Sequence, residues 1–104
     1  MGKYNIKYLP LFYKDLNKIT DYIANKLKNE IAANNLLNEI EKKINDRSFN
    51  PDSFEEYHSS RKRKNTYFRI YINNYTIFYT VKDKDVEIRR LLYSKMDFKK
   101  LLWW

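Results

Sequence analysis

Cysteine is absent from this sequence, and glycine and histidine each occur once. Without cysteine the chain can form no disulfide, has no thiolate nucleophile and offers no sulfur ligand to a metal. The single histidine, His58, argues against a histidine-rich metal site or a Ser-His-Asp triad and is interpreted as a loop residue. The single glycine, Gly2, argues against phosphate-binding loops, which need several glycines for their turns. We therefore expect neither a metal nor a bound cofactor.

Long apolar runs are missing as well. No stretch reaches the uninterrupted apolar length of about 18 residues that a membrane-spanning helix needs, and the N-terminus lacks the apolar run of a signal peptide. These absences predict a cytosolic protein with no membrane partner. The chain of 104 residues has the size of one domain, so residues 1–104 are expected to share a single core.

Negative charge is scarce relative to positive charge. The sequence has 21 Lys and Arg against 13 Asp and Glu, which gives a formal net charge of +8. This balance favours an anionic partner such as nucleic acid, a ribosome or an acidic protein. Charge alone does not choose among them.

The N-terminal half changes from the period of a strand to the period of a helix. Apolar and polar residues alternate over residues 3–9, which predicts a short strand that ends at Pro10. From Pro10 the apolar spacing becomes three or four residues, which predicts a helix whose first turn contains the proline. After an interruption at residues 28–30, the same spacing resumes from Ala33 to Ile44. We expect two helices that pack as an antiparallel hairpin.

The C-terminal half has the period of strands. Strands are expected at residues 66–72, 75–81 and 85–93, because residue types that form turns separate them. A short helix is expected at residues 96–104. The segment 47–65 has few apolar residues, and a structureless connection of this length is unusual, so it is either a functional loop or contains a short helical turn.

This order of elements predicts an α+β domain of the form β-α-α-β-β-β. An N-terminal strand, a helical hairpin and a three-stranded antiparallel meander are followed by a short C-terminal helix. Two helices on one face of an antiparallel sheet leave the other face partly open. We expect tyrosines and arginines on that open face.

The long connection contains the basic run Arg61, Lys62, Arg63 and Lys64. Together with Arg69 it places five positive charges and no acid within nine residues. One interpretation is a nucleic-acid-binding patch, since aromatic residues follow the run, and rings and guanidinium groups stack on the bases of single-stranded RNA. The other is a solvated loop whose charge maintains solubility.

Arg90 interrupts an apolar row in the last predicted strand. Strict alternation places it on the same face as Val86 and Ile88. A buried arginine is costly unless it is paired, so we expect either a carboxylate partner such as Asp97 or an anionic ligand. Tyr93, at the end of this strand, is a candidate proton donor or stacking platform, although most of the ten tyrosines must pack in the core.

Two segments resemble a known family. They are YTIFYTV at residues 75–81 and RLLYSKMDF at residues 90–98, and the N-terminal segment with Pro10, Asp15 and Tyr22 fits the same pattern. In this order they resemble the RelE/ParE superfamily of bacterial toxins over nearly the whole chain. The resemblance implies the toxin of a type II toxin-antitoxin pair. It also implies a partner, an acidic antitoxin that wraps the basic sheet and groove of the toxin.

Resemblance to RelE-like members implies, as the first interpretation, a ribosome-dependent endoribonuclease that cleaves mRNA without a metal. Its chemistry is general acid-base catalysis with electrostatic stabilisation of the phosphate. The catalytic candidates, at or beside positions that match the family, are Arg69, Arg90, Tyr93 and Lys95.

Two alternatives to mRNA cleavage stay open. ParE-like members of the superfamily inhibit DNA gyrase, which would then be the target. The chain could also be a catalytically degenerate module that only binds an antitoxin or RNA, because Thr76 and Met96 stand where the family usually has arginines.

Overall fold

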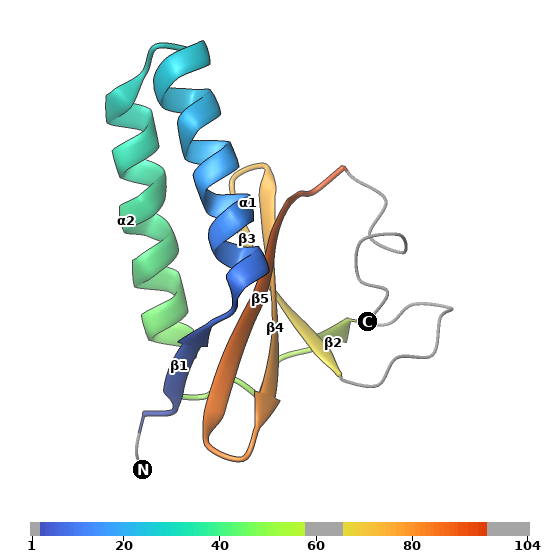
Figure 1. Ribbon diagram of the computed structural model, residues 1–104. Helices are drawn as coiled ribbons and strands as arrows, with labels where there is room; N and C mark the ends of the chain where they lie inside the picture. Colours follow the sequence, from blue (N-terminus) through green and yellow to red (C-terminus); the bar gives the residue numbers. More distant parts are fainter. Residues whose placement is uncertain (1–2, 58–65, 96–104) are drawn as a thin grey trace.

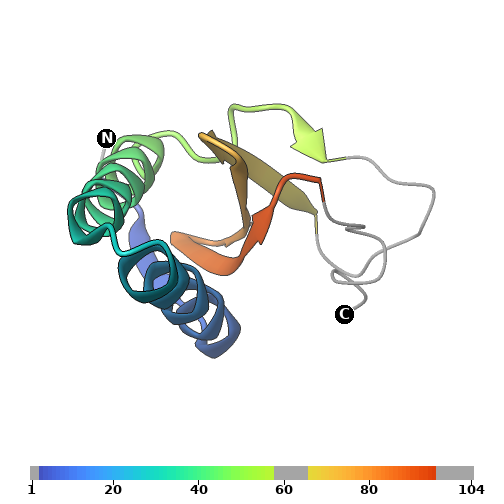
Figure 2. The same cartoon turned by 90° about the horizontal axis from the view of Figure 1, so that it is seen from above.

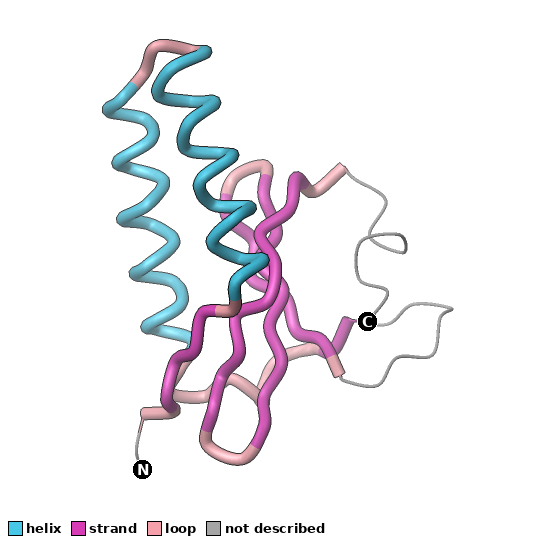
Figure 3. The backbone as a smooth tube through the Cα atoms, viewed as in Figure 1, coloured by secondary structure: helices cyan, strands magenta, loops and turns pink. Residues whose placement is uncertain are grey.

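The structure is a computed structural model that describes residues 3–57 and 66–95 (Figure 1). In chain order its elements are β1 (Asn5–Tyr8), α1 (Pro10–Asp21), the π-helical turn η1 (Tyr22–Lys26), α2 (Glu30–Arg47), β2 (Glu56–Tyr57), β3 (Tyr67–Ile72), β4 (Tyr75–Lys82) and β5 (Asp85–Tyr93). The predicted α+β order with a helical hairpin is confirmed, and Figure 3 shows the helical part of the chain followed by the strands of the meander. Within the described ranges, no helix has the length and apolar character needed to cross a bilayer.

The strands form one five-stranded sheet in the order β1-β5-β4-β3-β2. β1 runs parallel to β5, whereas the other neighbouring strands are antiparallel. The sheet is therefore mixed and not purely antiparallel as predicted, because β1 pairs in parallel with β5. The hairpin of α1 and α2 crosses one face of the sheet, and β1 and β2 lie at its opposite edges. Seen from above, both helices lie on the same side of the sheet (Figure 2).

The connection after α2 contains a strand that the sequence does not predict. Glu56 and Tyr57 form β2, which pairs with the beginning of β3. The expectation of a loop or a helical turn over residues 47–65 is wrong at these positions, since a strand of two residues is too short to produce an alternating pattern. The predicted C-terminal helix at residues 96–104 lies outside the described residues.

Local sequence signals mark the start of each helix in the hairpin. Pro10 occupies the first turn of α1, as predicted, where its missing N–H leaves no hydrogen bond unmade. At the start of α2, the side chain of Asn29 accepts a hydrogen bond from the N–H of Ala32 at 3.0 Å. The two helices are joined at Lys28, which adopts a left-handed conformation with φ of 52°.

The main core lies between the two helices and the sheet. Phe12 of α1 and Leu36, Ile40 and Ile44 of α2 are all buried there. Every second residue of β3 and β4 faces them, as the alternation predicts: Phe68, Ile70, Ile72, Ile77 and Tyr79.

The opposite face of the sheet has a smaller apolar cluster. Tyr67, Phe78 and Leu92 are buried there, and the half-buried Tyr57 packs against them. The predicted open face is thus only partly correct, because its centre is apolar and buried. Arg69 of β3 and Arg89 of β5 occupy half-buried positions on the two strands that flank β4.

A β-bulge in β5 changes which side chains reach the core. Phe78 of β4 lies opposite Arg90, but the next residue, Tyr79, lies opposite Ile88, so Arg89 is an extra residue in β5. The prediction that Arg90 shares a face with Ile88 is therefore wrong, and Leu91 joins Ile88 in the main core instead. Simple alternation fails here because the bulge shifts the period by one residue.

Candidate functional site

Arg90 forms a bidentate ion pair with Asp15 of α1. Its Nε donates to Oδ2 at 2.7 Å, and its Nη2 donates to Oδ1 at 2.9 Å. The two side chains are only 13% and 14% exposed, so the pair is mostly removed from water. The predicted need for a carboxylate is met by Asp15, while Asp97 lies outside the described residues.

The position of Asp15 follows from the ending of β1. β1 ends at Tyr8, opposite Ile88, so among the described residues the remainder of β5 has no neighbouring strand on that side. The carboxylate of Asp15 lies at this edge and accepts a hydrogen bond from the N–H of Leu91 at 3.0 Å. It thereby satisfies a main-chain donor that a longer β1 would otherwise bind.

The sequence contains a signal for this ion pair that the expectation of Asp97 overlooked. Asp15 lies three residues after Phe12 and four before Ile19, which places its carboxylate on the apolar stripe of α1. A carboxylate on the buried stripe of a helix needs a cationic partner. This reasoning predicts a buried cationic partner for Asp15, but it does not identify Arg90 as that partner.

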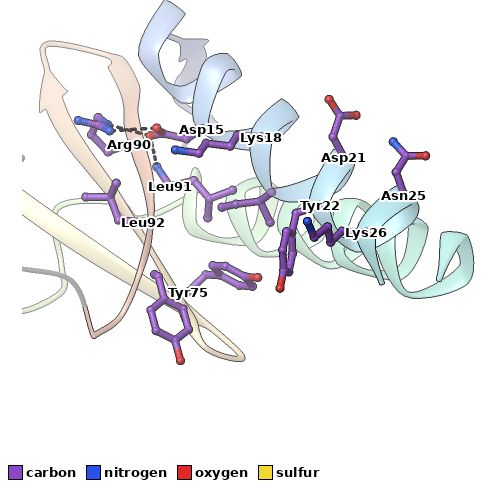
Figure 4. A pocket seen from close by; sticks show the side chains of 12 residues that line it. Asp15, Lys18, Asp21, Tyr22, Asn25, Lys26, Tyr75, Arg90, Leu91 and Leu92 are labelled. Atoms are coloured by element: carbon purple, nitrogen blue, oxygen red, sulfur yellow. Dashed lines mark hydrogen bonds and ion pairs between the residues drawn. The ribbon is translucent and has the colours of Figure 1, made fainter. Parts of the chain in front are cut away.

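Beside the ion pair lies a cavity of about 740 Å³ between α1 and η1 on one side and the end of β5 on the other. Its apolar and aromatic lining includes Ile19, Tyr22, Tyr75 and Leu91. Apart from the ion pair, its charged lining residues are Lys18, Lys26 and Asp21, so the lysines outnumber the acid. Figure 4 shows Tyr22 extending from the helix toward Tyr75, whereas Asp21 and Asn25 point away from the strands. Burial raises the pKa of Tyr75 above its ordinary value. The cavity suits an apolar side chain attached to an acidic segment.

Tyr93 lines the same cavity, from the side of the sheet that faces the helices. Its ring packs edge-on against Tyr75, with ring centres 6.1 Å apart, and its side chain is 40% exposed. Of the four predicted catalytic residues, the structure thus brings Arg90 and Tyr93 to one cavity. Lys95 follows the end of β5 and is exposed.

Arg69 lies on the opposite face of the sheet. It pairs with Phe78, which in turn pairs with Arg90, so the three residues form one row and share the face that points away from the helices. Arg90 reaches Asp15 from this row at the edge of β5. Two strand spacings separate the two arginine Cα atoms by roughly 10 Å. The guanidinium of Arg69 lies 5.0 Å from the ring centre of Tyr57 and 5.6 Å from that of Tyr71. This arrangement of cation and rings can hold the arginine in place or stack on a base.

The predicted nucleic-acid contacts Arg61, Lys62, Arg63 and Lys64 lie outside the described residues. Metal ligands do not cluster in the part that the structure does describe: no three His, Asp or Glu side chains of residues 3–57 and 66–95 are grouped to hold an ion.

Sequence reasoning also missed Arg47, which joins α2 to the sheet. Its Nη1 donates to the carbonyl of Arg69 at 2.9 Å and to the hydroxyl of Tyr79 at 2.8 Å. The Tyr79 hydroxyl in turn donates to the carbonyl of Pro51 at 2.7 Å. These bonds fix the segment after α2 against the sheet. No local pattern could reveal them, since they join residues far apart in the sequence.

Burial of tyrosines makes the stability of the protein sensitive to alkaline pH. Burial raises the pKa of Tyr79, an effect that the neighbouring Arg47 partly offsets, and it also raises the pKa of Tyr8 and Tyr75. Above about pH 10 the unfolded chain loses these protons while the folded chain retains them, so the free energy of unfolding falls as pH rises. We expect a loss of less than about 1.4 kcal/mol per pH unit for each tyrosine.

Urea denaturation between pH 7 and pH 11 measures this loss, and Tyr79→Phe identifies the contribution of Tyr79. At pH 7 this variant should be less stable by about 1–2 kcal/mol, because Pro51 and Arg47 each lose a partner. Above pH 10 its stability should fall less steeply than that of the parent chain. Tyr71→Phe, at an exposed tyrosine, is the control. Equal slopes for Tyr79→Phe and the parent chain would contradict the assignment.

Comparison with known proteins identifies one family whose profile matches and two solved structures with a similar fold. The sequence profile of the family described as "ParE toxin of type II toxin-antitoxin system, parDE" matches residues 6–98. A chain of the chromosomal ParDE toxin-antitoxin system from P. aeruginosa has a similar structure, with a TM-score of 0.73 and 15% identity over 89% of this chain and 98% of that chain. A chain of the E. coli DinJ-YafQ toxin-antitoxin complex gives a TM-score of 0.52 and 16% identity over 88% and 93%. At these identities the two structures establish likeness of fold alone. No curated protein sequence matches the chain.

Proposed function

Since the chain belongs to the ParE toxin family of type II toxin-antitoxin systems, we propose that it inhibits DNA gyrase and is held inactive by an acidic antitoxin. The observation that carries the proposal is the family match, which extends over residues 6–98 of the 104. The match favours the ParE-like alternative over mRNA cleavage, which was the first interpretation of the sequence.

The placement of the arginines also supports a toxin that acts by binding. Acid-base cleavage of RNA requires cationic groups and a proton donor to converge on one ribose and its phosphate. Here both carboxylate oxygens of Asp15 bind the guanidinium of Arg90, so it is less available to stabilise the charge of a phosphate. A toxin that blocks an enzyme by binding to it needs a complementary surface and no such convergence.

mRNA cleavage remains the second candidate because of one observation. Arg69 lies near the rings of Tyr57 and Tyr71, of which Tyr71 is 58% exposed. An exposed ring beside a guanidinium is a typical stacking platform for a base.

Expression of the chain alone is expected to stop bacterial growth, and the purified protein is expected to block supercoiling by gyrase. Plasmid supercoiling with purified gyrase measures the second effect directly. Primer extension on cellular mRNA is the companion measurement, and codon-spaced cuts with normal supercoiling would favour the second candidate. Normal growth at confirmed expression of folded protein would contradict both.

We place the antitoxin contact at the cavity beside Arg90, where apolar walls and two lysines suit an amphipathic acidic segment. A neighbouring small gene should restore growth, and Tyr22→Ala in the toxin should weaken that rescue. Leu27→Ala is the matched control, because Leu27 is 57% exposed against 53% for Tyr22 and does not line the cavity. Equal rescue of the two variants would show that the antitoxin does not bind at this cavity.

A further inference from the structure

The connection between α2 and β2, together with β2 itself, is acidic although the chain as a whole is basic. Residues 48–57 contain Asp52, Glu55 and Glu56 but no lysine or arginine, whereas the whole chain carries a net charge of +8. We call this segment the acidic strap. The three carboxylate residues are exposed, and within residues 3–57 and 66–95 none of them forms an ion pair. Their charge is therefore free to attract a partner.

The acidic strap is held against the rest of the fold at both ends and near its centre. The carbonyl of Ser48 accepts a hydrogen bond from the N–H of Tyr4 at 2.9 Å, and the last two residues of the strap pair with β3. Between them Pro51 is buried, and its carbonyl accepts a hydrogen bond from the hydroxyl of Tyr79. Figure 2 shows the strap leaving α2 on the side of the molecule away from α1. Such a fixed segment loses little conformational entropy when a partner binds.

Two aromatic rings of the acidic strap are exposed to solvent. Phe49 is 62% exposed and Phe54 is 46% exposed. The guanidinium of Arg47 lies 3.5 Å from the ring centre of Phe54 and covers one face of that ring. The other face can receive an arginine or an apolar side chain of a partner. Aromatic residues are enriched in protein interfaces and among the residues that contribute most to binding.

A pocket of about 380 Å³ lies beside Phe54, between the strap, α2 and β3. Two of its lining residues are cations that already donate hydrogen bonds to carbonyls of β3, Lys43 at 3.2 Å and Arg47 at 2.9 Å. The pocket therefore suits an apolar side chain, while the strap next to it supplies carboxylates. Its lining residues are Lys43, Asp46, Arg47, Phe54, Ile70 and Tyr71.

We propose that the acidic strap and this pocket bind a basic segment of the target protein, an identification that rests on the proposed function. An apolar side chain of the target enters the pocket, and its lysines or arginines lie beside Asp52, Glu55 and Glu56. Carboxylates repel nucleic acid and an acidic antitoxin alike, so charge argues against both as occupants. A symmetric contact with a second copy would place the same carboxylates against one another. Proteins that handle DNA carry lysines and arginines for its phosphates, so gyrase is expected to offer a basic segment.

Two variants test the ring and the charge of the strap separately. Phe54→Ala should weaken binding to purified gyrase about tenfold, as the loss of one strongly contributing interface ring does. Glu55→Lys reverses an exposed charge, so it should weaken binding about fivefold and make the affinity less dependent on salt. Affinity for immobilised gyrase at several salt concentrations measures both effects, and inhibition of plasmid supercoiling should weaken in parallel.

Tyr13→Ala and Glu41→Lys are the matched controls. Tyr13 of α1 is 50% exposed against 46% for Phe54, and Glu41 of α2 is exposed as Glu55 is. Both residues lie outside the strap and its pocket, so these variants should bind gyrase like the parent chain. Circular dichroism and thermal denaturation check that all the variants fold.

The proposal is overturned if Phe54→Ala and Glu55→Lys bind and inhibit gyrase as well as the controls do. Stronger inhibition by Glu55→Lys would also overturn it, because an added lysine favours a nucleic-acid partner. It is overturned too if ultracentrifugation finds that the free chain is a dimer which Phe54→Ala dissociates, because the strap then belongs to a second copy.

Growth arrest separates this proposal from the proposed function. If the parent chain arrests growth but leaves supercoiling intact, gyrase inhibition is wrong, and growth arrest by the same variants then tests the strap. Weaker arrest by Phe54→Ala and Glu55→Lys than by the controls would support the strap as the contact with another protein target, and equal arrest would overturn it. A parent chain that neither arrests growth nor blocks supercoiling would overturn both proposals.

Discussion

Replacing Asp15 with asparagine is expected to lower the free energy of unfolding by about 2–4 kcal/mol at pH 7. The substitution keeps the shape of the side chain and removes its charge, which leaves the guanidinium of Arg90 mostly buried without this counter-ion. Removing one partner of a buried ion pair costs more than the pair contributes, because the remaining charge stays out of water. Urea denaturation followed by circular dichroism measures the loss.

Asp21→Asn is the matched control for this substitution. Asp21 is the last residue of α1 and is exposed, so the same change of charge on the same helix should alter stability by less than about 0.5 kcal/mol. If Asp15→Asn is as stable as the control, the ion pair does not join α1 to β5 in solution. The cavity beside it would then lack a fixed wall.

Asp15 and Arg90 also illustrate how much of the candidate site can be predicted from the sequence. The interruption of an apolar row by Arg90 predicts that the arginine needs a partner, and the structure provides one. The identity of the partner depends on where β1 ends and on the angle at which α1 leaves it. Neither is encoded in the residues around Arg90, which is why the nearby Asp97 was the natural but unsupported expectation.

The fold was predictable where long periodic segments specify it. The spacing of apolar residues gives both helices and the three strands of the meander, and Pro10 marks the start of α1. The bulge at Arg89 was not predictable, since one extra residue leaves the composition of the strand unchanged and only shifts its faces. β2 was missed because pairing with β3, and not a local preference, makes its two residues a strand.

The parallel pairing of β1 with β5 was not predictable either, because it also depends on contacts with a distant part of the chain. Asn5 pairs with Asp85, eighty positions later, and no local signal reports a contact over that separation. Its consequence for function is considerable, because it makes β1 an edge strand and leaves the end of β5 open to Asp15. The cavity beside Arg90 thus lies where β5 continues past the end of β1.

Replacing Thr76 with arginine is expected to destabilise the protein by more than about 3 kcal/mol or to prevent folding. The resemblance to RelE-like toxins suggests an arginine at this strand position, and restoring it would be a natural test of a disarmed nuclease. In this chain, however, Thr76 is fully buried, with an exposure of 0%. Its hydroxyl shares a hydrogen bond of 2.8 Å with the hydroxyl of Ser94. A guanidinium at this position would lose its hydration and overfill the space between Tyr71 and Leu92, the residues opposite Thr76 on the neighbouring strands.

Thermal and urea denaturation of Thr76→Arg measure this effect, and Thr76→Ser is its control. Serine keeps the hydroxyl and removes one methyl group, so it should cost about 1 kcal/mol. A well-folded Thr76→Arg protein would show that the strand can accommodate the arginine. If that protein also cut mRNA, the RelE-like interpretation would regain support. Because position 76 is filled by packed side chains, we expect that one arginine there cannot restore a nuclease site. We expect instead that this chain acts through a surface that binds its target.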